Sequence, residues 1–194
     1  LDAFELVTAI VAGEDYDLRE DWLGPHGGAG DGRRSRMISG AAAAPLASRR
    51  DVLEVVEALD FLKGVSLLRT HARREAARAG GVEGRELPQV TCRREEVLRI
   101  TLADWRAHAD ALEAGFVEAS KLLNHCRFAA RWEVPYPTQL MVVAAVHGVL
   151  GDAARTAAAA EKLERWFWCS ALAEQYGSSP DSRAARDLQE LVRW

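Results

Sequence analysis

The chain has 194 residues, of which 48% are hydrophobic and 28% are charged, and its formal net charge is −4 at pH 7. This composition is typical of a globular domain with a real core and excludes a low-complexity, disordered chain. No apolar run approaches the roughly 20 residues of a bilayer span. The N-terminus also lacks the order of a secretion signal, so we expect a cytoplasmic protein without a membrane partner.

The first helix is predicted by apolar residues that repeat with the spacing of one helix face, namely Leu1, Phe4, Val7 and Val11. Gly13 is expected to end it. Because the chain opens inside an amphipathic helix without a starting Met, we interpret residues 1–23 as a helical segment that continues from a missing domain.

Residues 24–48 are rich in glycine and predict a loop, with at most a short alanine-rich helical piece. From Ser48 the pattern changes, because Ser48 can cap a helix with Asp51 three residues later. That helix is expected to run to about Arg78, and a second glycine-rich loop follows. Residues 49–131 are predicted to hold the long helices.

The next elements are marked by caps and prolines. A short helix is expected near residues 93–99, and Thr101 with Asp104 resembles a capping box that opens a long helix. Pro135 and Pro137 interrupt helical geometry, and Thr138 is predicted to cap the helix that follows, which Gly151 ends.

The C-terminal helices of residues 132–194 complete the chain. Residues 153–176 are expected to form one helix closed by Gly177 in the left-handed conformation, and Ser179 with Pro180 to open a last helix that ends at Leu191. Apart from the possible strand fragment LPQVTC, no alternating pattern predicts a strand. We therefore predict an all-α fold: a single domain, residues 1–194, forming an irregular bundle of about six or seven helices with the glycine-rich loop near residues 24–48.

Three aromatic residues stand side by side at Trp166, Phe167 and Trp168. On a helix the two tryptophans lie about 200° apart, so the helix is apolar on more than one side. The favoured interpretation is core; a partner interface and a ligand pocket are the alternatives.

No catalytic or metal site is recognisable. There is no GxSxG elbow, HExxH or P-loop, and the five histidines stand in unrelated contexts. The cysteines are odd in number and widely spaced, so we expect buried free thiols and no metal: Cys92, Cys126 and Cys169. We predict no catalytic residue and no cofactor in this chain.

The charge is unevenly distributed. Residues 33–94 hold 13 Lys or Arg against 7 Asp or Glu, a net charge of +6, whereas the remaining residues carry −10. Spacings of four residues predict two cationic rows on one helix, which could contact nucleic-acid phosphates or simply face solvent. The candidate phosphate-contact residues are Arg69, Arg73, Arg74, Arg78, Arg33 and Arg34.

Six segments, read in order, resemble the helical region of GmrSD-type restriction proteins: LDAFELVTAIVAGEDYDLREDW, DFLKGVSLLRTHARR, VTCRREEVLRITLADW, VPYPTQLMVVAAV, RWFWCSALAEQYG and RAARDLQEL. The resemblance implies a bacterial anti-phage protein, active in modification-dependent restriction. In that family an N-terminal domain similar to ParB and sulfiredoxin binds or hydrolyses nucleotide, and a His-Asn-His type domain cleaves DNA. Both are absent here, so nucleotide and Mg are expected only in the missing domains, with the nucleotide-binding domain as a partner.

The family's DGQQR motif has a superficial counterpart in DGRRSR at residues 31–36. It follows the LDAFELV segment instead of preceding it, so we transfer no function to it. We expect the chain to be a DNA-contacting helical scaffold. An interaction module that binds a protein partner or a second copy without nucleic acid, and an unrecognised helical hydrolase, are the alternatives.

Overall fold

The structure, a computed structural model, describes residues 2–24, 32–42, 53–128 and 133–194. It confirms the all-α prediction: these residues form nine α-helices and two short 3-10 helices, and none of them forms a strand. The α-helices are α1 (Ala3–Ala12), α2 (Leu18–Leu23), α3 (Arg33–Ala42), α5 (Ala58–Ala79), α6 (Arg94–Val97), α7 (Leu102–His125), α8 (Pro137–Leu150), α9 (Ala157–Leu172) and α10 (Pro180–Leu191). The 3-10 helices are η2 (Gly84–Glu86) and η4 (Gly151–Arg155).

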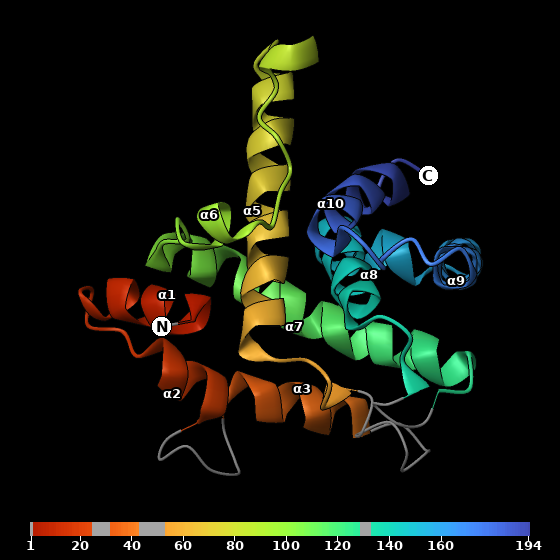
Figure 1. The fold of residues 1–194 in the computed structure, drawn as a ribbon, viewed down its shortest axis with the longest axis horizontal. Coiled ribbons are helices and arrows are strands. Elements are labelled where there is room, and N and C mark those ends of the chain that lie inside the picture. Colours follow the sequence, from red (N-terminus) through yellow and green to blue (C-terminus); the bar gives the residue numbers. More distant parts are fainter. Residues whose placement is uncertain (1, 25–31, 43–52, 129–132) are drawn as a thin grey trace.

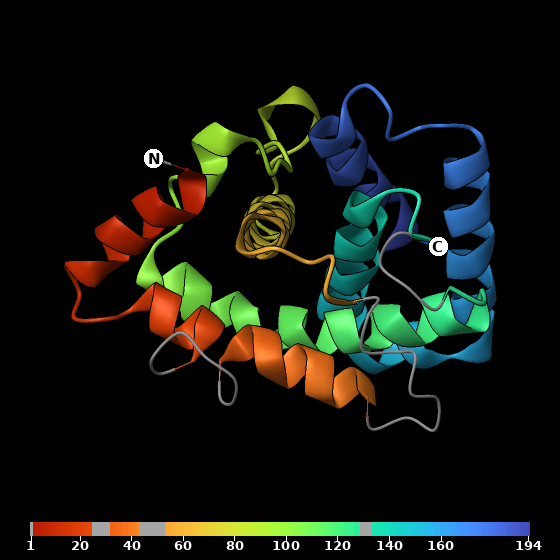
Figure 2. The same ribbon diagram turned by 60° about the horizontal axis from the view of Figure 1, so that its bottom comes forward.

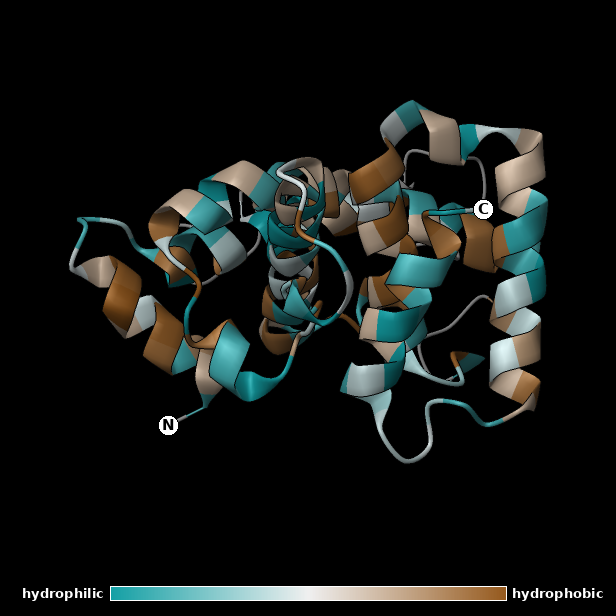
Figure 3. Cartoon of the chain, turned by 90° about the horizontal axis from the view of Figure 1, so that it is seen from above, coloured by the Kyte–Doolittle hydropathy of each residue, from teal (hydrophilic) through white to brown (hydrophobic). Residues whose placement is uncertain are grey.

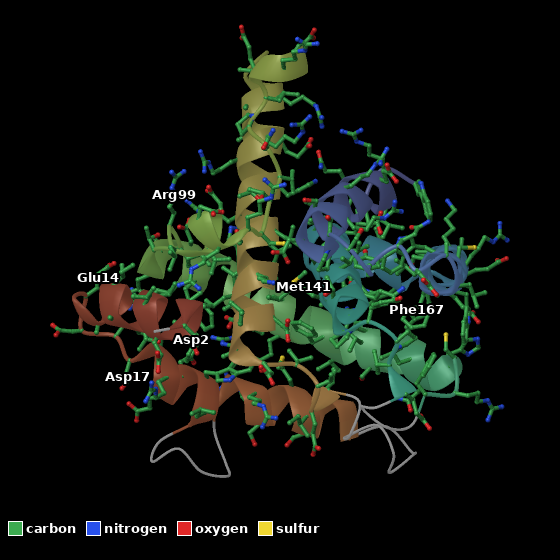
Figure 4. All side chains as sticks on the ribbon, viewed as in Figure 1. Asp2, Glu14, Asp17, Arg99, Met141 and Phe167 are labelled. Carbon is green, nitrogen blue, oxygen red and sulfur yellow. The ribbon has the colours of Figure 1, made fainter. Side chains whose placement is uncertain are left out.

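Helices α5, α7 and α8 meet at the centre, with α1 and α2 on one side and α9 and α10 on the other (Figures 1 and 2). Residues Gln139 to Val146 of α8 are all buried, as expected for a helix that is apolar all round. Met141 of this run lies between α5 and α8 (Figure 4). The helix α8 therefore forms the middle of the core.

Close packing of α7 against α8 depends on Gly115. A Cβ atom at this position would lie 2.2 Å from the carbonyl oxygen of Ala144, so a side chain has no room. Gly64 of α5 approaches α7 in a similar way, but there the nearest atom is the flexible end of Leu112. The glycines thus bring the three central helices together.

The N-terminal prediction holds for the described residues: Val7 and Val11 of α1 are buried and Phe4 packs against the core. Leu1 lies outside the described residues. The helix begins with a capping box in which Asp2 accepts from the amide of Glu5.

The loop predicted for residues 24–48 is wrong in part, because α3 occupies its middle. Met37 is completely buried, and Arg33 of α3 makes ion pairs with two carboxylates of α7. Gly32 just before α3 has a structural role, since a Cβ there would lie 2.2 Å from the backbone of Gly24. Tertiary contacts with α7 and α2 therefore stabilise a helix where glycine content predicts none.

The long helix predicted from Ser48 begins later. Ser48 and Asp51 lie outside the described residues, and α5 starts at Ala58 with a capping box between Glu57 and Asp60. Its C-terminal half projects beyond the neighbouring helices, and the segment after it returns alongside (Figure 1).

Two helix starts and one helix end follow the sequence signals. The box of Thr101 and Asp104 opens α7, and Ser179 with Pro180 opens α10. Gly151 ends α8 with a positive φ of 54°.

Two predicted boundaries are wrong. Helix α8 has Pro137 in its first turn and Tyr136 as its cap, because proline tolerates that position, where the amide has no helical partner. The helix predicted for residues 153–176 is shorter: η4 precedes it, Thr156 caps α9, and Leu172 ends it. The left-handed residue after α9 is Glu174, with φ 51°, and not Gly177.

The aromatic triplet is largely core. Phe167 is buried, and the buried Trp166 donates its indole N–H to Asp187 at 3.1 Å. Trp168 is 37% exposed and packs on Phe128, with 5.5 Å between ring centroids. The third ring therefore covers the edge of the core.

Candidate functional site

A polar pocket of about 280 Å³ lies where α5, the segment 88–93 and α10 meet, and we call this site the groove between α5 and α10. Helices α5 and α10 stand side by side in Figure 1, and Figure 3, in which α5 is seen down its axis, shows hydrophilic residues on both helices. The lining residues are Arg74, Gln89, Val90, Thr91, Arg93, Ser182, Ala185, Arg186 and Gln189. Three of them are arginines, one from each wall of the pocket.

Buried hydroxyl groups of α5 hold the segment 88–93 in place. Thr70 Oγ1 accepts from the backbone N–H of Thr91 at 3.1 Å and lies 3.2 Å from its carbonyl oxygen, and Ser66 Oγ donates to the same carbonyl at 3.0 Å. The segment satisfies these backbone groups with helix side chains and not with a strand partner. This is why the fragment LPQVTC is extended without forming a sheet.

Each arginine of the pocket is oriented by a different contact. Arg74 is half-buried, and its Nη1 donates to the carbonyl of Pro88 at 2.8 Å. Arg93 is exposed, and its Nη2 donates to Ser182 Oγ at 3.0 Å. The exposed Arg186 pairs with Glu190 on its own helix at 3.0 Å.

The pocket carries a positive charge that is not neutralised from within. No carboxylate is among its lining residues, and neither Arg74 nor Arg93 makes an ion pair within the part of the chain that the structure describes. The pair of Arg186 with Glu190 is exposed on both sides, and such pairs contribute only about 0–1 kcal/mol. The pocket therefore favours an anion, above all one with several oxygen acceptors.

The positive charge extends along α5. Burial lowers the pKa of His71, and the charges of Arg78, Arg193 and Arg74 lower it further, while Glu75 acts in the opposite direction. At pH 7 His71 is therefore neutral and adds no positive charge near Arg74.

The second cationic row of α5, Arg69 and Arg73, faces carboxylates. Arg69 and Arg73 both contact Glu96 of α6, at 3.0 and 3.1 Å, and Arg69 also contacts Asp104 at 3.0 Å. Arg99, which lies at the surface beside α6, contacts Glu96 too (Figure 4). Arg69 is only 12% exposed, so this row mainly joins α5 to α6 and α7.

The two candidates on α3 lie on the other side of the molecule (Figure 1). Arg33 is buried among acidic side chains, and Arg34 donates to the carbonyl of Glu54 at 3.4 Å. Of the six predicted phosphate-contact residues, only Arg74 lines the pocket, and Arg78 pairs with Glu75 on α5.

Two arginines of the pocket were missed by the sequence analysis. Arg93 and Arg186 lie in segments that are far apart in the sequence. Only the packing of α10 against α5 brings them to Arg74. No local pattern could have found them.

A second cleft of about 560 Å³ lies between α7, the end of α8, η4 and α9. It brings together histidines and carboxylates, including His125, which lies 3.4 Å from Glu164, and Glu118, which Lys121 contacts at 2.8 Å. The cleft contains both signs of charge in pairs, and it holds no serine or cysteine nucleophile among its lining residues. A hydrolase that uses a serine or cysteine nucleophile would find none among these lining residues.

The predicted buried thiols are confirmed for Cys92 alone. Cys126 is half-buried and Cys169 is exposed, because Cys169 lies on the outer face of α9; all three are free thiols. Within the described ranges, no group of three or more potential ligands could hold a metal ion. No described helix is long and apolar enough to cross a membrane.

Comparisons of the chain with protein-family models, with curated proteins and with solved structures give no match.

Proposed function

We propose that this chain is the helical, DNA-contacting part of a cytoplasmic restriction protein of the GmrSD type, and that it contacts nucleic-acid phosphates through the groove between α5 and α10. The observation that carries the proposal is the pocket in which Arg74, Arg93 and Arg186 converge without a lining carboxylate. The family assignment is supported by the six ordered sequence segments.

The local charge matters because the whole chain is acidic. With a net charge of −4, the molecule as a whole repels a polyanion, so attraction must come from one face. The pocket supplies three cations, Arg74, Arg93 and Arg186, of which Arg186 pairs with Glu190.

Arginine contacts to phosphates position nucleic acid without reading its sequence. Each contact also releases counterions, so affinity falls as salt increases, with a slope of about −0.9 per phosphate neutralised. In this proposal the nucleotide chemistry and the Mg belong to a separate N-terminal domain, and this chain contributes binding and support.

The test is the affinity of the double variant Arg74→Ala/Arg93→Ala for a short labelled DNA duplex, measured by fluorescence anisotropy at several salt concentrations. We expect Kd to rise about tenfold and the salt slope to fall by about two, one for each lost contact. The control is Arg165→Ala on α9, since Arg165 is 76% exposed and only contacts Glu161.

Arg69 is a poor choice for such a variant, because it also holds Glu96 and Asp104. Circular dichroism must show that the double variant is folded. Unchanged Kd and salt slope in the folded double variant would refute the proposal.

An interaction module is the second candidate, favoured by apolar side chains that stay exposed on the surface of α9 and at the last residue of the chain. Leu172 is 80% exposed, Trp194 is 60% exposed and Trp168 is 37% exposed. If this surface binds a second copy, light scattering will show a dimer without DNA, and Leu172→Ser will weaken it. A monomer at all concentrations would exclude self-association.

A further inference from the structure

The charge of the pocket can be compared with the two forms in which nucleic acid presents phosphate. An internal phosphodiester carries one negative charge, whereas a phosphomonoester at a strand end carries between about 1.5 and 2 at pH 7. Arg74 and Arg93 supply two guanidinium groups without a carboxylate partner among the described residues. The charge of the pocket therefore matches a dianion better than a monoanion.

The polar groups of the pocket come from separate parts of the fold. Its walls come from three elements, α5, the segment 88–93 and α10, and the hydrogen bond from Arg93 to Ser182 connects two of them. A volume of about 280 Å³ is sufficient for a phosphate group and lies near the lower end of the range for small-ligand sites.

Neutral donors complete the set around the pocket. Ser182 can turn its hydroxyl toward an anion that displaces it from Arg93, and the side-chain amide of Gln89 offers further N–H groups. Gln189 has one side-chain N–H to offer, because its Nε2 already donates to the carbonyl of Ala185 at 2.9 Å. A tetrahedral phosphate has three free oxygens as a monoester and only two as a diester, so the monoester uses more of these donors.

We propose that this pocket is a receptor for a dianionic phosphate monoester, such as the terminal phosphate of a nucleic-acid strand. The inference rests on the proposed function, because it names the kind of phosphate that the groove between α5 and α10 receives. A free phosphate ion has the same chemistry, and the experiment separates the two sources.

The experiment compares two DNA hairpins of identical sequence, each with a single 5′ end that carries either a phosphate or a hydroxyl group. We expect the phosphorylated hairpin to bind about tenfold more tightly, which corresponds to about 1.4 kcal/mol. Arg93→Ala should abolish this difference, and Arg165→Ala should leave it unchanged. Arg93 is the N-cap residue of α6, but its side chain makes no capping hydrogen bond, so its replacement leaves the start of the helix intact.

Inorganic phosphate serves as the second probe, followed by competition with the phosphorylated hairpin. If inorganic phosphate competes only at concentrations far above the Kd of the phosphorylated hairpin, the pocket is a receptor for strand ends. If it competes at concentrations similar to that Kd, the pocket is a receptor for free phosphate. The inference is overturned if the two hairpins bind with equal affinity and inorganic phosphate does not compete with either. If both hairpins nevertheless bind more weakly to the Arg74→Ala/Arg93→Ala variant, the proposed function stands. Failure of both hairpins to bind refutes the proposed function itself.

Discussion

Removal of the buried guanidinium of Arg33 tests whether this residue supports the fold and not the binding of DNA. Its Nε lies 3.2 Å from Asp21, and its Nη1 lies 2.7 Å from both Asp110 and Glu113. Burial alone would lower the pKa of Arg33, but the hydrogen bond to Asp110 and the charges of the three carboxylates raise it overall. The side chain joins α2, α3 and α7.

The magnitude follows from the exposure of the partners. Asp110 is 88% exposed and contributes little, whereas Asp21 and Glu113 are each only 17% exposed and lose a buried partner. Breaking a buried pair costs about 3–5 kcal/mol. Asp21 keeps the indole N–H of Trp105 at 2.8 Å, so we expect the lower end, about 3 kcal/mol, for Arg33→Ala.

For a chain of this length such a loss lowers Tm by about 6–12 °C. The assay is urea and thermal unfolding followed by circular dichroism. Arg165→Ala removes an exposed pair and should change the free energy of unfolding by less than about 0.5 kcal/mol. If Arg33→Ala lowers the free energy of unfolding by less than about 1 kcal/mol, Arg33 does not support the fold as argued. If Arg33→Lys is folded but binds DNA more weakly, Arg33 contributes to binding after all.

Three further predictions concern packing, pH and thiol reactivity. Gly115→Ala should lower the free energy of unfolding by about 1–3 kcal/mol, measured by urea unfolding, because its methyl group meets the backbone of α8. Because the pKa of His71 is lowered in the folded protein, this histidine is protonated in the unfolded chain first as pH falls, and the free energy of unfolding should decrease below about pH 6.5. His71→Gln should reduce the pH dependence of the free energy of unfolding between about pH 7 and 5.5. Cys169, which is exposed, should react with iodoacetamide at pH 8 in the native protein, whereas Cys92, whose pKa burial raises to about 12, should react only after unfolding, as mass spectrometry can show.

Local signals predicted the elements whose stability depends on nearby residues. The capping box at Thr101 and the proline after Ser179 each define a helix start within a few residues of chain. The sequence predicted α8 only as a helix between Pro137 and Gly151; its central position follows because no face of it can meet water without cost. Such features need no knowledge of distant segments.

The elements that the sequence did not predict depend on distant contacts. Helix α3 has few apolar residues, and Met37 is its buried contact, so its stability comes largely from the pairing of Arg33 with α7. Gly32 is typical of a loop by its sequence, whereas in the structure it allows the backbone before α3 to approach the end of α2 closely. Helical propensity contains neither kind of information.

The two rows of arginines on α5 show why spacing alone cannot locate a binding site. Arg69 and Arg74 are separated by little more than one helical turn, and the sequence gives no reason to treat them differently. Helix α6 places Glu96 against Arg69, which neutralises it, whereas the segment before α6 gives Arg74 only the carbonyl of Pro88. A carbonyl orients a guanidinium without cancelling its charge, so Arg74 keeps its attraction for an anion. Whether a cation on this helix supports the fold or attracts a ligand is therefore decided by the partner that the tertiary structure supplies.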